Sequence, residues 1–257
     1  MHTLVIDIGG TNVKVWKTGE TDRHKIPSGK ELKPETLVEE VKKLAVGWAF
    51  DRVSIGYPGQ VVNGHPTTDC VNLGPGWKDF DYAGALGVSV RIQNDACMQA
   101  LGSYEGGKML YLGLGTGIGS AFISDGIIIP LALGHLKFCN GEDFNHYLSR
   151  KGLELHGAKR WRRAVTDASK VLKEAFFAEY VVLGGGNAKK LEEMPEGCRR
   201  GSNHNAYFGG LRMWEDAVPL SAPTALQIAS ETLQPATEVA EAEAPEPKLL
   251  TPAAMGI

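Results

Sequence analysis

Cysteine is scarce in this sequence, and long apolar runs are missing from it. Its four cysteines lie far apart and include no C-x-x-C pair, which argues against a disulfide framework or a zinc knuckle and favours a reducing compartment. No apolar run approaches the roughly 20 residues that span a bilayer. The N-terminal stretch MHTLVIDIGG lacks the basic region of a signal peptide. We therefore expect a cytoplasmic protein without a membrane segment.

An excess of charge of one sign is missing as well. The 27 basic and 30 acidic residues give a net charge of −3, and hydrophobic residues make up 43% of the 257. These values are ordinary for a globular chain that can bury a sizeable core. They give no reason to expect a nucleic-acid or membrane-surface protein.

The C-terminal segment 219–257 lacks aromatic residues and holds six of the thirteen prolines. Its five glutamates and one lysine give it a charge of −4. Such a segment cannot bury enough apolar surface to offset its ordering entropy. We predict a disordered tail rich in Pro, Ala and Glu over 219–257.

Glycine, in contrast, is abundant, and it is clustered. The 32 glycines include groups that follow apolar runs, at 9–10, 56–59, 74–76, 113–119 and 184–186. Glycine adopts positive φ and lets the backbone approach a ligand closely. Each cluster is therefore either a tight turn or a loop that binds phosphate or sugar.

The hydrophobic pattern predicts an α/β chain in which one unit occurs twice. In each unit a strand ends in a glycine turn and a second strand returns at once, over 3–17 and over 109–123. Further strands are predicted over 52–57, 88–92 and 180–183, and helices over 34–46, 94–104, 142–149, 158–177 and 205–216, with a short helix from 187. We predict a small lobe over 1–93, which the helix at 205–218 completes, and a larger lobe over 94–204.

The first glycine turn follows an acidic strand end. Asp7 precedes Gly9, Gly10 and Thr11, and Lys14 follows them. Such a turn presents backbone N–H groups and a hydroxyl to phosphate oxygens. Asp7 is a candidate ligand of Mg²⁺ through water, because this ion keeps several waters and needs few carboxylates. Lys14 supplies a point charge for a phosphate.

The second glycine turn has the same design and makes Gly115, Thr116 and Gly117 candidate phosphate-binding residues. It comes close to the dinucleotide fingerprint G-x-G-x-x-G, but Ile118 stands where the third glycine belongs. No helix is predicted directly after the turn either. A phosphate loop is therefore the better interpretation.

Asn94 and Asp95 lie where a predicted strand meets a predicted helix. They are ordinary N-cap residues. Between two phosphate loops, however, Asp95 can accept the proton of an alcohol that attacks phosphorus, and Asn94 can bind a neighbouring hydroxyl.

A last cluster follows the strand at 180–183 and offers bare backbone to a purine: Gly184, Gly185 and Gly186.

These patterns occur in the order found in the ROK (repressor, open reading frame, kinase) family of sugar kinases, which the chain resembles over residues 3–216. The segments that carry the resemblance are DIGGTNVK, SIGYPGQV, VNLGPGW, QNDACMQALGSYEGG, LGLGTGIGS, LGHL and VVLGGGNAKKL. Within the family the chain looks most similar to the polyphosphate-dependent glucokinases. The resemblance implies an actin/hexokinase-like (ribonuclease H-like) duplicated βα fold, with two lobes around a sugar/phosphate cleft.

The resemblance also implies an activity: phosphoryl transfer to the 6-hydroxyl of glucose from polyphosphate, ATP or both, with Mg²⁺. By analogy Asp95 is the general base and Asn94 a sugar ligand. Further sugar ligands are implied by matching segments: Gly59, Asn72, His135 and Glu142. Without the family context a lone histidine is more often structural than a ligand. The same analogy implies a homodimer.

Two features depart from the family pattern. The zinc-binding cysteine cluster of many members is missing, since only Cys139 closely follows His135, and we predict no zinc site. The family's Glu-x-Gly-His reads Ala132-Leu133-Gly134-His135 here, and a methyl group accepts no hydrogen bond from a sugar hydroxyl. Losing one partner of a buried polar pair costs about 1–3 kcal/mol. The alternatives are therefore a kinase for mannose or an amino sugar, and a non-catalytic sugar or phosphate sensor.

The polar side of the helix predicted over 158–177 is basic: Lys159, Arg160, Arg162, Arg163, Lys170 and Lys173. Such a cluster is either a solvated face or a track for a linear polyanion such as polyphosphate. Nucleic acid is disfavoured as a partner, because without the predicted tail the chain carries only +1, and no helix-turn-helix precedes Asp7.

Overall fold

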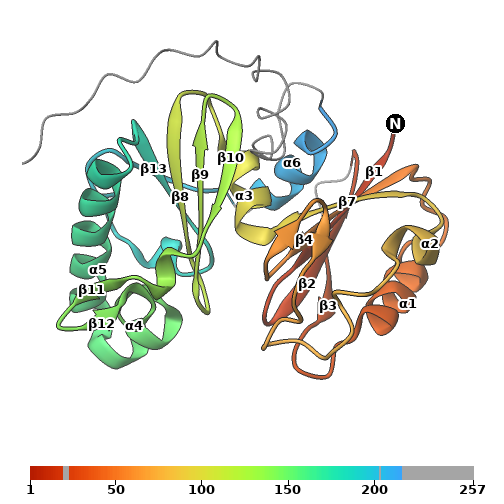
Figure 1. Cartoon of the computed structure of the whole chain (residues 1–257), viewed down its shortest axis with the longest axis horizontal. Helices are drawn as coiled ribbons and strands as arrows, with labels where there is room; N and C mark the ends of the chain where they lie inside the picture. Colours follow the sequence, from red (N-terminus) through yellow and green to blue (C-terminus); the bar gives the residue numbers. More distant parts are fainter. Residues whose placement is uncertain (20–22, 203, 216–257) are drawn as a thin grey trace, which may run out of the picture. The chain divides into compact units, whose positions relative to one another are not determined.

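The structure is a computed structural model, and it describes residues 1–19, 23–202 and 204–215. The tail predicted over 219–257 lies outside the described residues. Within them the chain is α/β and contains two five-stranded sheets (Figure 1). The predicted α/β class is thus confirmed. No helix in this part of the chain is both long and apolar enough to cross a membrane.

The first sheet has the strand order β3-β2-β1-β4-β7. Its strands are β1 (Thr3–Ile8), β2 (Asn12–Lys17), β3 (His24–Pro27), β4 (Arg52–Tyr57) and β7 (Ser89–Asn94). β1, β2 and β3 run antiparallel, whereas β4 and β7 are parallel to β1. The hairpin predicted over 3–17 is confirmed, the strand predicted over 52–57 is confirmed residue for residue, and β3 is an additional strand.

The second sheet repeats this arrangement in the order β10-β9-β8-β13-β14. Its strands are β8 (Lys108–Leu114), β9 (Ile118–Ser124), β10 (Ile127–Leu131), β13 (Tyr180–Gly184) and β14 (Cys198–Arg200). Again three antiparallel strands precede strands that pair parallel to the first. The predicted duplication is therefore present in the strand order as well as in the two glycine turns.

The helices are α1 (Pro34–Leu44), α2 (Tyr82–Leu86), α3 (Asp95–Ser103), α4 (Phe144–Leu148), α5 (Arg150–Ala175) and α6 (Asn205–Arg212). Short 3₁₀ helices η1 and η2 cover Leu133–His135 and Ala188–Lys190. Two small hairpins pair β5 (Val61–Val62) with β6 (His65–Pro66) and β11 (Lys137–Cys139) with β12 (Glu142–Asp143).

Two helix predictions need correction. The helix predicted over 142–149 is shorter, because Glu142 and Asp143 form β12 and the Asp143 side chain then caps α4. The helix predicted over 158–177 is present as the second part of α5 but ends at Ala175, and a helical segment from Arg150 that the pattern does not predict precedes it. Gly157 has the non-helical angles φ 74° and ψ 161°, so the chain kinks there. The amphipathic pattern after this kink marks only the second part of α5.

Helix α3 links the two sheets, since it contacts β4 and β7 of the first and β8, β9 and β10 of the second. It also packs along α6, and Figure 1 shows the two helices side by side. A Cβ on Gly102 of α3 would overlap the backbone of Asn205, and one on Gly209 of α6 would overlap that of Met98. These glycines let the helices approach closely. Because α6 contacts α3 as well as β1 and β4, its assignment to the lobe 1–93 stays a prediction.

Candidate active site

Asp7 lies at the end of β1, directly opposite Lys14 of β2. The Lys14 Nζ donates to Asp7 Oδ2 at 2.6 Å. Asp7 is 1% exposed, and its Oδ1 is buried without a hydrogen-bond partner in the described part of the chain. A buried acceptor without a partner costs about 1–3 kcal/mol. Asp7 therefore has one oxygen that a bound group can satisfy.

The turn after β1 holds Gly9, Gly10 and Thr11. Gly9 N–H donates to the carbonyl of Asn12 at 3.2 Å, and a Cβ on Gly9 would lie 2.9 Å from that oxygen. Gly9 thus closes the turn at a position that has no room for a side chain. Gly10 and Thr11 are exposed, so their backbone and the Thr11 side chain are accessible to a ligand.

Asp95 follows β7 directly and is the first residue of α3. The sequence starts a helix here because Asn94 caps it: Asn94 Oδ1 accepts from the N–H groups of Ala96 (3.0 Å) and Cys97 (3.2 Å). Asp95 Oδ1 also accepts from Ala96 N–H, at 2.8 Å. At Gly56, the end of β4, a Cβ would overlap Met98 and come within 3.4 Å of Asp95 Cα. Glycine at that position lets α3 begin against the sheet.

The environment of Asp95 raises the pKa of its carboxyl group to about 7. The largest cause is burial, which removes water from the charged form, and the second is the negative charge of Asp7. The Ala96 N–H and the Lys14 ammonium act in the opposite direction. A carboxyl group with such a pKa can take up or release a proton near neutral pH.

Asn94 also reaches the loop after β4. Its Nδ2 donates to the carbonyl of Gly59 at 3.0 Å. A Cβ on Gly59 would lie 2.6 Å from the ring of Tyr57, so this glycine lets the loop fold over that ring. The structure thus brings Asn94, Asp95 and Gly59 together. The helix cap uses the Asn94 amide oxygen, and one amide hydrogen is left for a ligand.

The second glycine turn is held from one side by backbone and side-chain donors. Gly115 N–H donates to Gly117 O at 3.2 Å, and Gly115 O accepts from Arg150 N–H at 2.8 Å. The Nδ2 of Asn187 also donates to Gly115 O, at 3.4 Å. Thr116 and Gly117 are exposed. The turn is therefore anchored at its base while its tip is free.

The two glycine turns face each other. A Cβ on Gly10 would lie 3.9 Å from the hydroxyl oxygen of Thr116. A further approach occurs at the base of the second turn, where a Cβ on Gly119 would lie 3.0 Å from the Cβ of Ala96. Asp95, the neighbour of Ala96, therefore lies beside the second hairpin, and the charges of Asp7 and Lys14 in the first hairpin act on its carboxyl group.

The third glycine cluster ends β13. A Cβ on Gly184 would overlap the hydroxyl of Tyr111, and Gly185 has φ +78° against the backbone of Leu114. Packing and turn geometry therefore explain these two glycines. Gly186 is exposed with no atom within 4 Å of its Cβ position, so its surface is open. The next N–H, that of Asn187, donates to Leu114 O at 3.0 Å and ties this cluster to the second turn.

His135 is exposed at the end of η1. Its N–H donates to the carbonyl of Ala132 at 3.2 Å. At the start of the same turn the Leu133 N–H donates to Ser120 Oγ at 3.1 Å, and Ala132 itself is exposed. The position of the family's glutamate thus holds a methyl group at an accessible surface.

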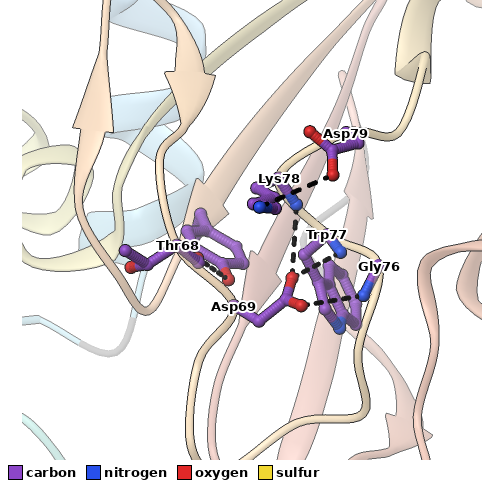
Figure 2. Close-up of polar contacts among 7 residues, drawn as sticks. Thr68, Asp69, Gly76, Trp77, Lys78 and Asp79 are labelled. Atoms are coloured by element: carbon purple, nitrogen blue, oxygen red, sulfur yellow. Dashed lines mark hydrogen bonds and ion pairs between the residues drawn. The ribbon is translucent and has the colours of Figure 1, made fainter.

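Asn72 and Glu142 form no hydrogen bond or ion pair with these residues in the described part of the chain. Glu142 is exposed on β12, with Oε2 3.8 Å from Nδ1 of His146. Asn72 is exposed in the loop that Asp69 closes. Figure 2 shows the Asp69 carboxylate accepting from the N–H groups of Gly76 (3.1 Å), Trp77 (2.8 Å) and Lys78 (3.3 Å). These bonds, with that from Gly76 first, lower the pKa of Asp69.

The donor set of the site fits Mg²⁺ better than zinc. No group of three or more His, Cys, Asp or Glu in residues 1–19, 23–202 and 204–215 could hold a metal ion. The unpartnered Oδ1 of Asp7, with Asp95 nearby, suits an ion that is bound through its own waters. The absence of a zinc site stays a prediction.

Three residues that the motifs did not single out hold loops that contain candidate site residues. They are Asp69, Asn145 and Asn187, and each acts through hydrogen bonds to loop backbone. The only sequence feature that indicates the loop-closing role of Asp69 is its place a few residues before the Gly-Pro-Gly-Trp segment. The partners of the two asparagines are distant in sequence, so no local pattern indicates them.

Known proteins resemble this chain in sequence. Polyphosphate glucokinase of Mycobacterium tuberculosis (strain CDC 1551 / Oshkosh) is 27% identical over 214 residues, which cover 75% of this chain and 80% of that protein. Polyphosphate glucokinase of Mycobacterium leprae (strain TN) is 29% identical over 209 residues, which cover 73% of this chain and 64% of that protein.

Solved structures resemble it in fold. Inorganic polyphosphate/ATP-glucomannokinase of Arthrobacter sp. strain KM has a TM-score of 0.69 at 25% identity and covers 81% of this chain and 96% of its own. The ROK family glucokinase of Streptomyces griseus, solved with glucose and AMPPNP, has a TM-score of 0.66 at 15% identity, covering 83% and 99%. The fold is thus the actin/hexokinase-like fold of these kinases. The ROK family matches residues 3–135, which include both glycine turns, Asp95 and His135, and the chain belongs to this family.

Proposed function

We propose that this protein is a sugar kinase that transfers a phosphoryl group from polyphosphate, ATP or both to the 6-hydroxyl of glucose. The observation that carries the proposal is the position of Asp95 beside the second glycine hairpin and within reach of the Asp7 and Lys14 charges of the first, with a pKa raised to about 7. A carboxylate with this pKa is ionised in about half of the molecules near neutral pH and can act as a general base. The names of the relatives in Mycobacterium and Arthrobacter support the sugar and the donors.

In the proposed reaction Asp95 accepts the proton of the attacking hydroxyl. The hydroxyl oxygen forms a bond to the terminal phosphorus, and the bond from this phosphorus to the donor's bridging oxygen breaks. Lys14 and the N–H groups of both turns (Gly10, Thr11, Thr116 and Gly117) stabilise the charge on the transferred group. When bound at Asp7, Mg²⁺ supplies neutralisation of the phosphate oxygens.

The sugar is proposed to lie on the side of Asn94, Gly59 and His135. Asn72 and Glu142 remain proposed sugar ligands on family analogy alone. The purine of ATP would lie against the 184–186 turn, where Gly186 is open. A cytoplasmic location, inferred from the sparse and dispersed cysteines, and a homodimer, inferred from family analogy, also belong to the proposal.

The basic side of α5 bears on the donor. Arg162 is paired with Glu192 at 2.6 Å, and Arg163 lies 3.8 Å from Asp167. Lys159, Arg160 and Lys170 are exposed and have no ion pair in the described part of the chain. Three free cations on one helix support polyphosphate as a donor, because a linear polyanion gains from a row of positive charge.

A second candidate is a kinase for mannose or an amino sugar, and Ala132 is the observation that favours it. The methyl group leaves an exposed position where the family's glutamate would accept hydrogen bonds. A site without this acceptor loses discrimination at the sugar hydroxyls it would contact.

Steady-state phosphorylation by the purified protein tests these proposals. Glucose, mannose and glucosamine are each assayed with Mg²⁺, once with ATP and once with polyphosphate. Turnover of glucose with at least one donor supports the glucokinase, and preferential turnover of another sugar supports the second candidate. Absence of turnover with every pair, while glucose still binds, would make the protein a sensor and not a kinase.

A further inference from the structure

Asn145 is the second residue of α4 and lies far in sequence from the second glycine turn. Its Oδ1 accepts from the N–H of Ile118 at 2.9 Å. Ile118 directly follows Gly117, so this bond holds the end of the turn. The bond also shows which of the two terminal amide atoms of Asn145 is the oxygen, because only the oxygen can accept from a backbone N–H. Asp143 fixes the helix itself, since its Oδ1 accepts from His146 N–H at 2.8 Å.

The carboxamide of Asn145 lies between two glycines of different segments. On one side, a Cβ on Gly117 would be 3.5 Å from Oδ1, an ordinary contact distance. On the other side, a Cβ on Gly134 would be 2.5 Å from Nδ2 and 2.8 Å from Oδ1. The amide therefore occupies the space that a side chain at Gly134 would need. Gly134 precedes His135, so one side chain contacts both the donor turn and the proposed sugar turn.

Other groups hold the second turn from the opposite end. Gly115 O accepts from Arg150 N–H at 2.8 Å and from Asn187 Nδ2 at 3.4 Å. Neither of these bonds reaches η1. Of the three groups, Asn145 is the one that also touches the segment of His135.

We propose that Asn145 is a positioning residue that holds the donor phosphate loop 115–118 in register with the sugar-binding turn 132–135. This inference rests on the proposed kinase function. The chemical reason is that transfer requires the attacking oxygen and the phosphorus to be aligned, and a displacement of about 1 Å costs on the order of 100-fold in rate. Loss of the amide leaves the Ile118 N–H without its partner and removes the contact with Gly134.

Three variants separate this role from a merely structural one. Asn145→Ala removes the acceptor, and we expect kcat to fall at least tenfold with a rise in the KM of both sugar and donor. Asn145→Asp keeps an acceptor for Ile118 but places negative charge beside Gly117; we expect the sugar KM to recover and the donor KM to stay high. Asn187→Ala removes a hydrogen bond to Gly115 O in the donor turn and none to the sugar-binding turn. Only the donor KM should therefore rise.

Asn63→Asp is the matched control, because it makes the same chemical change at an exposed turn between β5 and β6. Asn63 already has φ 50°, a conformation that Asp tolerates. This variant should leave both KM values and kcat unchanged. Thermal unfolding of all variants shows whether a loss of activity reflects loss of the fold.

Hydrogen exchange supplies a readout that does not depend on turnover. In Asn145→Ala we expect the Ile118 amide to exchange at least tenfold faster than in the wild type, and in Asn145→Asp to remain protected. If the wild type phosphorylates no sugar, the proposed function fails, while exchange still decides whether Asn145 holds the loop. An active wild type with unchanged kinetics and unchanged Ile118 exchange in Asn145→Ala would overturn the positioning role.

Discussion

The two glycine turns close hairpins of the same topology, but their strands carry different residues at equivalent positions. Next to each turn is an apolar pair, Ile8 with Val13 in the first hairpin and Leu114 with Ile118 in the second. One step further the first hairpin has the pair Asp7 and Lys14, and the second has Gly113 and Gly119.

The difference shows how one duplicated element can serve two purposes. The first hairpin places an ion pair and an unpartnered carboxylate oxygen at the site. The second hairpin has no side chain at the equivalent pair, Gly113 and Gly119, and its Gly119 lets the start of α3 come close. Charge thus comes from one repeat and space from the other, and Asp95 lies where the two meet.

The largest effect is expected from Asp95→Asn, which removes the proposed base and keeps the fold. The rate should fall by about 10²–10⁴, the usual contribution of general acid–base catalysis. In the wild type the rate should fall as the pH drops below about 7, since protonated Asp95 cannot accept a proton. Both are measured as pH profiles of kcat/KM. A variant within tenfold of the wild type would exclude Asp95 as the base.

Stability provides the control for this variant. The pKa of Asp95 is about 7 in the fold and about 3.9 in an unfolded chain. Between these values the native state binds more protons than the unfolded state, so this carboxyl lowers stability as pH rises from 4 to 7. Asp95→Asn has no carboxyl group at this position and therefore does not lose this stability as the pH rises. It should be at least as stable as the wild type at pH 8, with the gap closing towards pH 4.

Two neutralising variants of the first hairpin should shift the pH profile in opposite directions. The Lys14 charge lowers the pKa of Asp95 and the Asp7 charge raises it. Lys14→Gln should therefore move the acidic limb of the profile to higher pH, and Asp7→Asn should move it to lower pH. Each should also reduce kcat by about 10–100-fold, because each removes a group that is proposed to bind phosphate or Mg²⁺. Shifts in the same direction would show that the first hairpin does not tune Asp95.

Both hairpins are predictable from the sequence because their signals are local. A β-branched or apolar run, a glycine turn and a returning strand lie within 15 residues or so, and the period of two needs no distant partner. Asn94 and Asp95 are equally local, since a cap bonds to N–H groups two and three residues ahead. For the same reason the helix start after 94 is predicted within one residue.

The connections between segments are not predictable in this way. Asn145 binds Ile118 across 27 residues, and Asn187 binds Gly115 across 72. Asp69 accepts hydrogen bonds from backbone N–H groups. Because almost every residue type has such a group, the residue types in the loop do not reveal these bonds. The first part of α5 was missed because Gly157 interrupts its pattern. Local patterns therefore indicate the groups proposed to react, whereas the residues proposed to align them are found only from the fold.

Ala132→Glu tests whether a side chain at position 132 can reach the bound sugar. If the family's glutamate accepts sugar hydrogen bonds, restoring it should lower the glucose KM by about tenfold, in line with about 1–3 kcal/mol for one such bond. The donor KM should not change. Ala132→Gln is the matched control, since it adds similar volume without the charge. A glucose KM that rises in both variants would show that this position is occupied by another substituent, as in the second candidate function.

The smallest effect is expected from filling the space that Gly119 leaves. In Gly119→Ala the new Cβ would lie 3.0 Å from that of Ala96, so α3 must shift by a few tenths of an ångström. Overpacking of this kind costs about 1–3 kcal/mol, partly offset by the 0.4–1 kcal/mol gained when Gly is replaced in the unfolded chain. We expect a decrease in Tm of a few degrees and a rate loss below about threefold.

The double variant Gly119→Ala/Ala96→Gly tests whether this contact is the cause. It restores the space and keeps the backbone N–H of residue 96, which donates to the side-chain Oδ1 atoms of Asn94 and Asp95. Glycine within a helix costs up to about 1 kcal/mol, so the Ala96→Gly single variant is measured as well. A coupling energy near zero in this cycle would mean that the second hairpin does not restrict α3. A clear coupling energy would mean that glycine at position 119 allows β9 to pack against α3, the helix that begins with Asp95.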